Sequence, residues 1–244
     1  MNGRRALLAL LALLAGGTPA CNASPAAPTA GPPQAPASRP ADPRFDDRFW
    51  RELIFNEHDA PGQGSFVRVL ANPSPSVYVR LGDAGGTRRV VTDAELDHIR
   101  EVLPRLAEQI TGRPYDGRIE SGIEERGDRE GWITVRFVTP EEHPDIGASC
   151  GLATPGSDPG SIWIAGDNDQ CFRNGYFRRL FAHELGHAFG LWHVGDHAAM
   201  MSEAGNDSEW FTERERYHAQ LAYEVGRGAA YCGWPFGPGC AGGT

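Results

Sequence analysis

The chain has 244 residues, and 40% of them are apolar, which is enough for a globular core and excludes wholesale disorder. All 23 basic residues are arginine, and 32 acidic residues bring the formal net charge to −9, or −11 once Arg4 and Arg5 are removed with a leader. This balance argues against a nucleic-acid binder, which needs a basic surface to displace phosphate counterions.

The first twenty residues have the pattern of a signal peptide. Arg4 and Arg5 precede an unbroken apolar run over residues 6–15, which small residues follow. Ten residues are too few to cross a bilayer, since a spanning helix needs about 17–25. We therefore expect residues 1–20 to be cleaved and the mature protein to be exported, either secreted or held at a membrane surface.

Residues 21–44 predict a tether. The tetrapeptide Thr18-Pro19-Ala20-Cys21 resembles a bacterial lipobox, in which the cysteine is acylated, although threonine replaces the usual leucine. Lipidation of Cys21 and ordinary cleavage nearby are both open. Lipidation would leave four of the five cysteines for two disulfides. The segment after Cys21 is rich in proline and alanine and favours an extended spacer.

A globular domain of mixed strands and helices is expected over residues 45–228. Two Thr-x-x-Glu capping boxes, at residues 92–95 and 212–215, open predicted helices that end near residues 111 and 226. The other predicted elements are strands at 76–81, 131–139, 151–155 and 161–165 and a helix at 175–189. The chain has no Gly-rich phosphate loop and no dinucleotide-binding fingerprint.

The segment that carries chemistry begins at His183. His183 and His187 are four residues apart, so on a helix they lie on one face and can share a metal ion. Glu184 lies about 100° round the helix, which places its carboxylate beside the metal rather than among the ligands. His193 can reach the third ligand position only if the helix ends, and Gly190 can adopt the positive φ that ends it.

Three neutral imidazoles leave one tetrahedral position of Zn²⁺ open, as in catalytic rather than structural zinc sites. The residues therefore predict one catalytic zinc ion held by His183, His187 and His193. The metal would lower the pKa of water to about 7, and Glu184 would act as the general base.

This segment resembles the signature of metzincin metalloproteases, H-E-x-x-H-x-x-G-x-x-H followed by a Met-turn. Met201, eight residues after His193, stands where a matrixin-like Met-turn methionine would be, with Met200 as a weaker choice. The resemblance implies an α+β fold: a twisted, mostly parallel sheet with an antiparallel edge strand, a long helix, an active-site helix and a C-terminal helix. It also implies a zinc endopeptidase acting on proteins or peptides.

The resemblance further implies that the edge strand, around Gly151, Leu152 and Ala153, pairs with the substrate backbone. The chain departs from matrixins after the Met-turn, because Ser202 and Glu203 replace the usual Tyr-Pro. Astacins and serralysins have a zinc-binding tyrosine where Glu203 stands, which argues against those branches. No cysteine-switch motif is recognisable.

Several other segments admit two interpretations. Asp167 and Asp169 suit a Ca²⁺ site, but turn chemistry explains them as well. His143 and Asp145 weakly resemble the second metal loop of matrixins, and a solvated loop is the simpler interpretation. Residues 45–75 form a candidate inhibitory extension, with Glu57 or Asp59 as carboxylates that would block the zinc.

The remaining cysteines can pair in three ways. One pairing joins Cys150 to Cys171 beside the active site and Cys232 to Cys240 in the Gly-rich tail, residues 229–244. Two alternatives to a protease also stay open: a zinc hydrolase of one narrow, non-protein amide, and a non-catalytic lipoprotein that uses zinc to stabilise a binding module. The sequence carries no indication of oligomeric state.

Overall fold

The computed structural model describes residues 42–82, 90–126, 128–204 and 208–230. Residues 1–20, most of the 21–44 tether, Cys21, and the tail with Cys232 and Cys240 lie outside them. No helix among the described residues is both long and apolar enough to cross a membrane.

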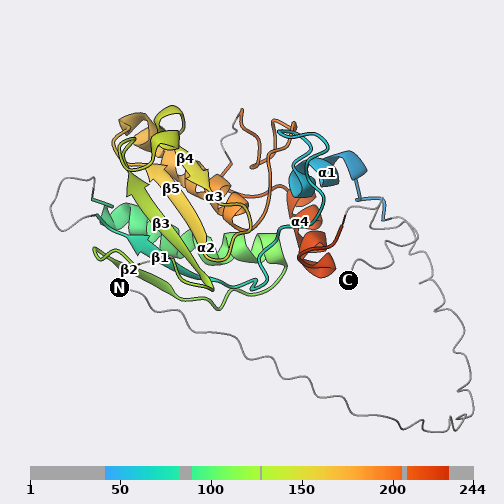
Figure 1. Ribbon diagram of the computed structural model, residues 1–244, viewed down its shortest axis with the longest axis horizontal. Helices are drawn as coiled ribbons and strands as arrows, with labels where there is room; N and C mark the ends of the chain where they lie inside the picture. The colour runs from blue at the N-terminus through green and yellow to red at the C-terminus, as the bar shows by residue number, and fades with distance from the viewer. Residues whose placement is uncertain (1–41, 83–89, 127, 205–207, 231–244) are drawn as a thin grey trace, which may run out of the picture. The chain divides into compact units, whose positions relative to one another are not determined.

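The centre of the fold is a five-stranded sheet in the order β2-β1-β3-β5-β4 (Figure 1). The first four strands in that order run parallel, and β4 pairs antiparallel with β5 at the edge. The strands are β1 Ser76–Arg80, β2 Ile119–Gly122, β3 Trp132–Val138, β4 Gly151–Ala153 and β5 Gly160–Ala165. The predicted α+β class with a mostly parallel sheet and an antiparallel edge is therefore confirmed.

The inner strands β1, β3 and β5 are buried along most of their length, as expected for parallel strands covered on both faces. Val79, Val135 and Ile162, for example, are fully buried. The long helix α2, Asp93–Thr111, begins at the predicted capping box of Thr92 and Glu95 and ends at Gly112, whose φ is 68°. It contacts both α3, Tyr176–Ala188, and α4, Glu213–Val225.

Helix α1, Asp47–Phe55, has no counterpart among the predicted elements. It lies beside α4 and away from the sheet (Figure 1). Its side chains Trp50, Leu53 and Ile54 are at most 1% exposed and belong to the main hydrophobic core. This burial argues against a detachable inhibitory extension over residues 45–75, because removing the segment would open the core.

Two short 3₁₀ helices and a disulfide frame the segment that leads to α3. The 3₁₀ helices are Pro144–Ala148 and Asp169–Gly175. Cys150 and Cys171 form a disulfide with a Cα–Cα distance of 5.5 Å, which confirms this bridge among the three alternative pairings. The disulfide therefore links the start of the edge strand β4 to the 3₁₀ helix that precedes α3.

Candidate metal centre

Helix α3 presents two histidines and then ends abruptly. Gly190 has a φ of 101°, a conformation that side-chain-bearing residues rarely adopt. A Cβ at this position would lie 2.7 Å from the carbonyl oxygen of Arg68 and 2.8 Å from the Cα of Val69. Glycine is therefore required both by the backbone angle and by the close approach of another segment. The turn that it makes returns the chain toward α3, as the motif predicts.

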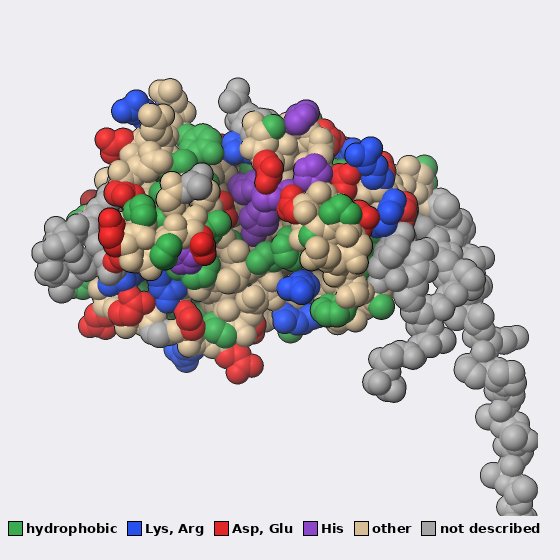
Figure 2. All heavy atoms as spheres, turned by 45° about the horizontal axis from the view of Figure 1, so that its top comes forward, with side chains coloured by type: hydrophobic (Ala, Val, Ile, Leu, Met, Phe, Trp, Pro, Cys, Tyr) green, Lys and Arg blue, Asp and Glu red, His purple; other side chains and the backbone are tan. Residues whose placement is uncertain are grey.

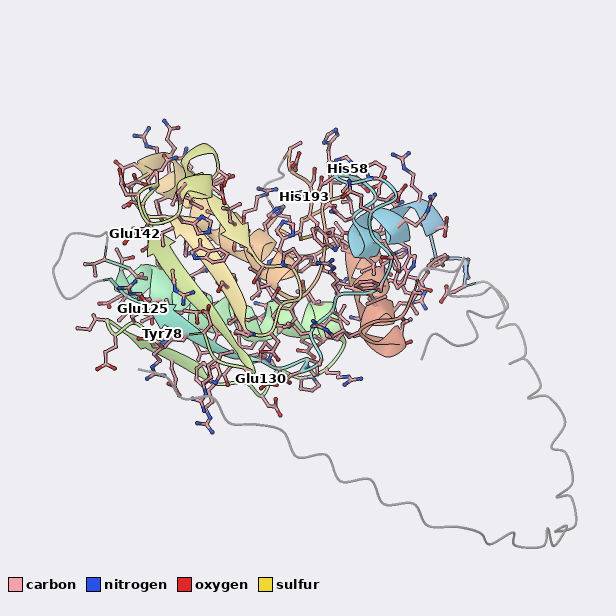
Figure 3. All side chains as sticks on the ribbon, in the orientation of Figure 1. His58, Tyr78, Glu125, Glu130, Glu142 and His193 are labelled. Carbon is pink, nitrogen blue, oxygen red and sulfur yellow. A yellow bond between two sulfur atoms is a disulfide. The ribbon has the colours of Figure 1, made fainter. Side chains whose placement is uncertain are left out.

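The three predicted ligand nitrogens converge after this turn. The Nε2 atom of His193 lies 3.2 Å from Nε2 of His183 and 3.1 Å from Nε2 of His187. Figure 2 shows histidine side chains gathered where this face is hollowed, and Figure 3 places His193 between α3 and the loop after α1. Two nitrogens bound to one tetrahedral Zn²⁺ would lie about 3.3 Å apart, since the Zn–N bond is about 2.0–2.1 Å. The spacing suits a metal ion.

Hydrogen bonds at the outer nitrogens fix the protonation of the inner ones. Nδ1 of His183 donates to the carbonyl oxygen of Met200, and Nδ1 of His187 donates to that of Leu191, each at 2.8 Å. A carbonyl oxygen only accepts, so both Nδ1 atoms carry the proton and both Nε2 atoms present a bare lone pair. Both lone pairs face Nε2 of His193, and a cation between the three nitrogens would be stabilised by them. The group can therefore hold a metal ion.

Burial favours the neutral imidazoles that a metal requires. His183 and His187 are each 8% exposed. Burial lowers the pKa of His183 to about 4 and holds the pKa of His187 well below its ordinary value. Both rings are therefore uncharged at neutral pH, ready to coordinate without first losing a proton.

The ring of His193 is hydrogen-bonded to a residue that lies far away in the sequence. Its Nδ1 lies 2.9 Å from Oδ2 of Asp59, in the loop after α1, and 3.5 Å from Oε1 of Glu203. Asp59 was a candidate for blocking the metal. Its hydrogen bond instead goes to the outer nitrogen of the ring, where a carboxylate orients a histidine ligand and strengthens it as a base. The motif alone gives no sign of this partner.

Glu184 lies beside the histidines without joining them. Its side chain is 4% exposed, and its Oε2 atom is buried without a hydrogen-bond partner among the described residues. Burial raises the pKa of its carboxyl to about 8, while the positive charge of Arg179 acts in the opposite direction. The edge strand passes close by, since a Cβ at Gly151 would lie 2.5 Å from Oε1 of Glu184.

Met201 lies beneath the site and is fully buried. A Cβ at Gly186 on α3 would overlap the Met201 sulfur, so glycine at this position lets helix and methionine pack directly. The Met201 N–H donates to Oε1 of Glu215 at 2.8 Å, and its carbonyl oxygen accepts from the Val194 N–H at 3.0 Å. The sequence predicts Glu215 only as a helix cap. Its hydrogen bond with the Met201 N–H forms only in the tertiary fold.

A cavity of about 480 Å³ lies over the histidines. All three residues of β4 line it, namely Gly151, Leu152 and Ala153, together with Glu184 and Arg179. The predicted metal ligands, general base and edge strand therefore meet at one opening. The size lies within the range usual for ligand pockets, about 300–1,000 Å³.

The other candidate metal residues do not meet in this way. Within the described ranges, possible three-ligand groups are His183–His187–His193 and a second, Asp59–His193–Glu203, which shares His193. Asp167, Asp169, His143 and Asp145 belong to neither. The His143 ring instead lies 4.6 Å from the ring of Trp163.

The chain matches no protein-family model, and a search of curated proteins finds no relative.

Proposed function

We propose that the protein is a zinc-dependent endopeptidase of the metzincin type, closest in organisation to matrixins. The observation that carries this proposal is the convergence of three imidazole Nε2 atoms next to the buried carboxyl group of Glu184, whose Oε2 has no hydrogen-bond partner among the described residues, at the base of an open cavity. A purely structural zinc site has no use for such a carboxylate. The α+β fold and its antiparallel edge strand suit the same family.

His183, His187 and His193 would hold the zinc ion, which when bound supplies Lewis-acid activation of water and of the scissile carbonyl. Glu184 would take a proton at Oε2 from the attacking water and pass it to the leaving nitrogen. Its Oε2 atom has no hydrogen-bond partner among the described residues, so it is free to accept that proton. Met201 would act only by packing under α3.

The edge strand would orient the substrate. Because β4 pairs with β5 on one side, its other side can receive an extended peptide by β-augmentation. The absence of a side chain at Gly151 and the small side chain of Ala153 would let that backbone approach Glu184 closely. We further propose that the protein is exported through residues 1–20 and is either secreted or anchored through a lipidated Cys21.

Cleavage of a diverse peptide mixture, mapped by mass spectrometry, tests the function. The wild type, a chelator-treated sample and Glu184→Gln would be compared, with zinc content measured for each. We expect cuts from the wild type alone, and a loss of at least about a hundredfold for Glu184→Gln with zinc retained. Glu213→Gln, an exposed carboxylate on α4, is the matched control and should cleave normally.

Activity that survives in Glu184→Gln would contradict the assignment of this residue. If the wild type bound one zinc ion per chain and cut no peptide, the proposal of an endopeptidase would fail. A hydrolase of a narrow amide, or a zinc-stabilised binding module, would then take its place.

A further inference from the structure

Arg179 is a buried cation in the wall of the cavity. It lies on α3 four residues before His183, so both side chains leave the same face of the helix, about 6 Å apart along its axis. Its side chain lines the cavity, yet the residue as a whole is only 8% exposed. A charge placed this deeply loses most of its hydration, which costs free energy unless other groups compensate.

The protein compensates this charge only in part. A guanidinium has five N–H donors. Within the described part of the chain, Arg179 gives one hydrogen bond, from Nη2 to the carbonyl oxygen of Ser202 at 2.9 Å. Its Nε is buried and has no partner there. Four of the five donors therefore have no hydrogen-bond partner among the described residues.

Within the described residues, no carboxylate that lines the cavity accepts a hydrogen bond from Arg179. Asp59 and Glu203 lie against His193, and Glu184, whose carboxyl is close enough to feel the charge of Arg179, keeps its Oε2 atom without a hydrogen-bond partner there. Arg179 is the one Arg or Lys among the described residues that line the cavity. Apart from Glu184, its neighbours on α3 that line the cavity are Tyr176, Leu180 and the metal-site histidines of this helix, none of which is a carboxylate. The wall formed by Arg179 is thus the part of the cavity that would attract an anion.

We propose that Arg179 selects substrates that carry Asp or Glu close to the scissile bond. The proposal rests on the proposed peptidase function and names its substrate class. A carboxylate fits the planar guanidinium through two parallel hydrogen bonds, which Gln or Leu could not reproduce. Because Arg179 lies one helical turn from His183 and an extended peptide rises about 3.3 Å per residue, we expect the acidic residue within a few positions of the cut.

A set of alanine-based octapeptides tests this selection. Glu, Gln, Leu or Arg is moved through each position, and cleavage by the zinc-loaded protein is followed by mass spectrometry. We expect Glu to be preferred over Gln by about tenfold or more at one position near the cut. Arg179→Lys should keep part of the preference, and Arg179→Gln should lose it. Arg178→Gln is the matched control, since this neighbour on the same helix is exposed to solvent.

Binding to the zinc-loaded Glu184→Gln variant separates this inference from the function on which it rests. Calorimetry with the same Glu and Gln octapeptides should show tighter binding of the acidic peptide, and adding Arg179→Gln should abolish the difference. Acid-selective binding without any cleavage by the wild type would refute the peptidase and leave the acidic subsite standing. Cleavage or binding that treats Glu and Gln alike would overturn the subsite. So would an Arg179→Gln variant that only melts earlier and slows on every peptide equally, since Arg179 would then serve only to hold the Ser202 carbonyl.

Discussion

At the scale of single residues, the candidate metal centre depends on partners of its ligands as much as on the ligands. His183 and His187 are oriented by backbone carbonyls that belong to Met200 and Leu191. His193 is oriented by a side chain, that of Asp59, which lies 134 residues earlier in the chain. The third ligand is therefore the one whose orientation a substitution outside the motif can change.

Replacing Asp59 with Asn should weaken zinc binding. The amide still fills the space, but the negative charge beside the His193 ring is lost, and such partners contribute about 10- to 100-fold to metal affinity. Competition with a chelator of known affinity would measure the change. Glu203→Gln is the comparison, because its carboxylate lies 3.5 Å from the same nitrogen, beyond a good hydrogen bond. Equal losses for the two variants would contradict the orienting role of Asp59.

At the scale of elements, α1 joins the core to the metal site. Its buried face packs in the main hydrophobic core, and its end is tied to the returning chain by a hydrogen bond from the Trp192 N–H to the Leu53 carbonyl oxygen, 2.8 Å. Oε2 of Glu52 also accepts from the Gly195 N–H at 3.1 Å. These two bonds bracket His193, so α1 helps to place the third ligand.

Leu53→Ala should therefore destabilise the whole domain. Leu53 is fully buried, and truncating a buried leucine to alanine costs about 2–5 kcal/mol through lost burial and the cavity left behind. Denaturant unfolding would report the change, with exposed Arg48→Ala on the same helix as the control. A loss below about 1 kcal/mol would mean that α1 packs too loosely to belong to the core, and would restore the detachable extension.

His218 makes the contact between α1 and α4 sensitive to pH. This fully buried ring accepts at Nε2 from the Asp46 N–H, 3.0 Å, and donates from Nδ1 to the Arg214 carbonyl oxygen, 2.7 Å. Only the neutral ring can do both. Burial accordingly lowers the pKa of His218, with the charge of Arg214 acting in the same direction and that of Asp46 opposing it.

Because this pKa is lowered by folding, the stability that His218 contributes is present above its unfolded value of about 6.5 and is lost as the pH falls below it. In metal-free protein, His218→Gln should lose less stability than the wild type between pH 7.5 and 5.5, by about 1 kcal/mol. Denaturant unfolding of both proteins at both pH values gives this difference in stability. The metal-binding histidines are present in both proteins, so their contribution cancels. His58→Gln, at an exposed position, should behave as the wild type does. If the stability of His218→Gln fell with pH as much as that of the wild type, His218 would be excluded as the source of this pH dependence.

At the scale of the whole molecule, sequence patterns predict what is local and miss what depends on the fold. Capping boxes mark the starts of α2 and α4, and the spacing of His183, His187 and Gly190 predicts the ligand cluster and its turn. These features are encoded within about ten neighbouring residues. Helix α1 is not among the predicted elements, although the N-cap Asp46 and the helical spacing of its buried apolar residues are local signals for it.

Strand β2, which does not line the cavity, is short and half-buried throughout, so it lacks the alternation of buried and exposed residues that marks a strand in sequence. Two residues near the metal centre also cannot be predicted from local patterns. Asp59 and Glu215 reach the site through contacts across the fold. Arg179 is a different case, since its place one turn before His183 on the same helix face was available from spacing alone.

Zinc should in turn stabilise the whole molecule, because its ligands come from α3 and from the chain after the Gly190 turn, which unfolding separates. A ligand that binds only the folded state adds about 4 kcal/mol at a free concentration 1,000 times its dissociation constant, or about 10 °C in melting temperature for a domain of this size. Calorimetric scans of metal-free protein with and without zinc would measure this shift. His193→Ala should lose most of it, whereas His197→Ala, an exposed histidine outside the cluster, should keep it. An undiminished shift in His193→Ala would place the bound zinc elsewhere and remove the metal from the cavity in which Glu184 lies.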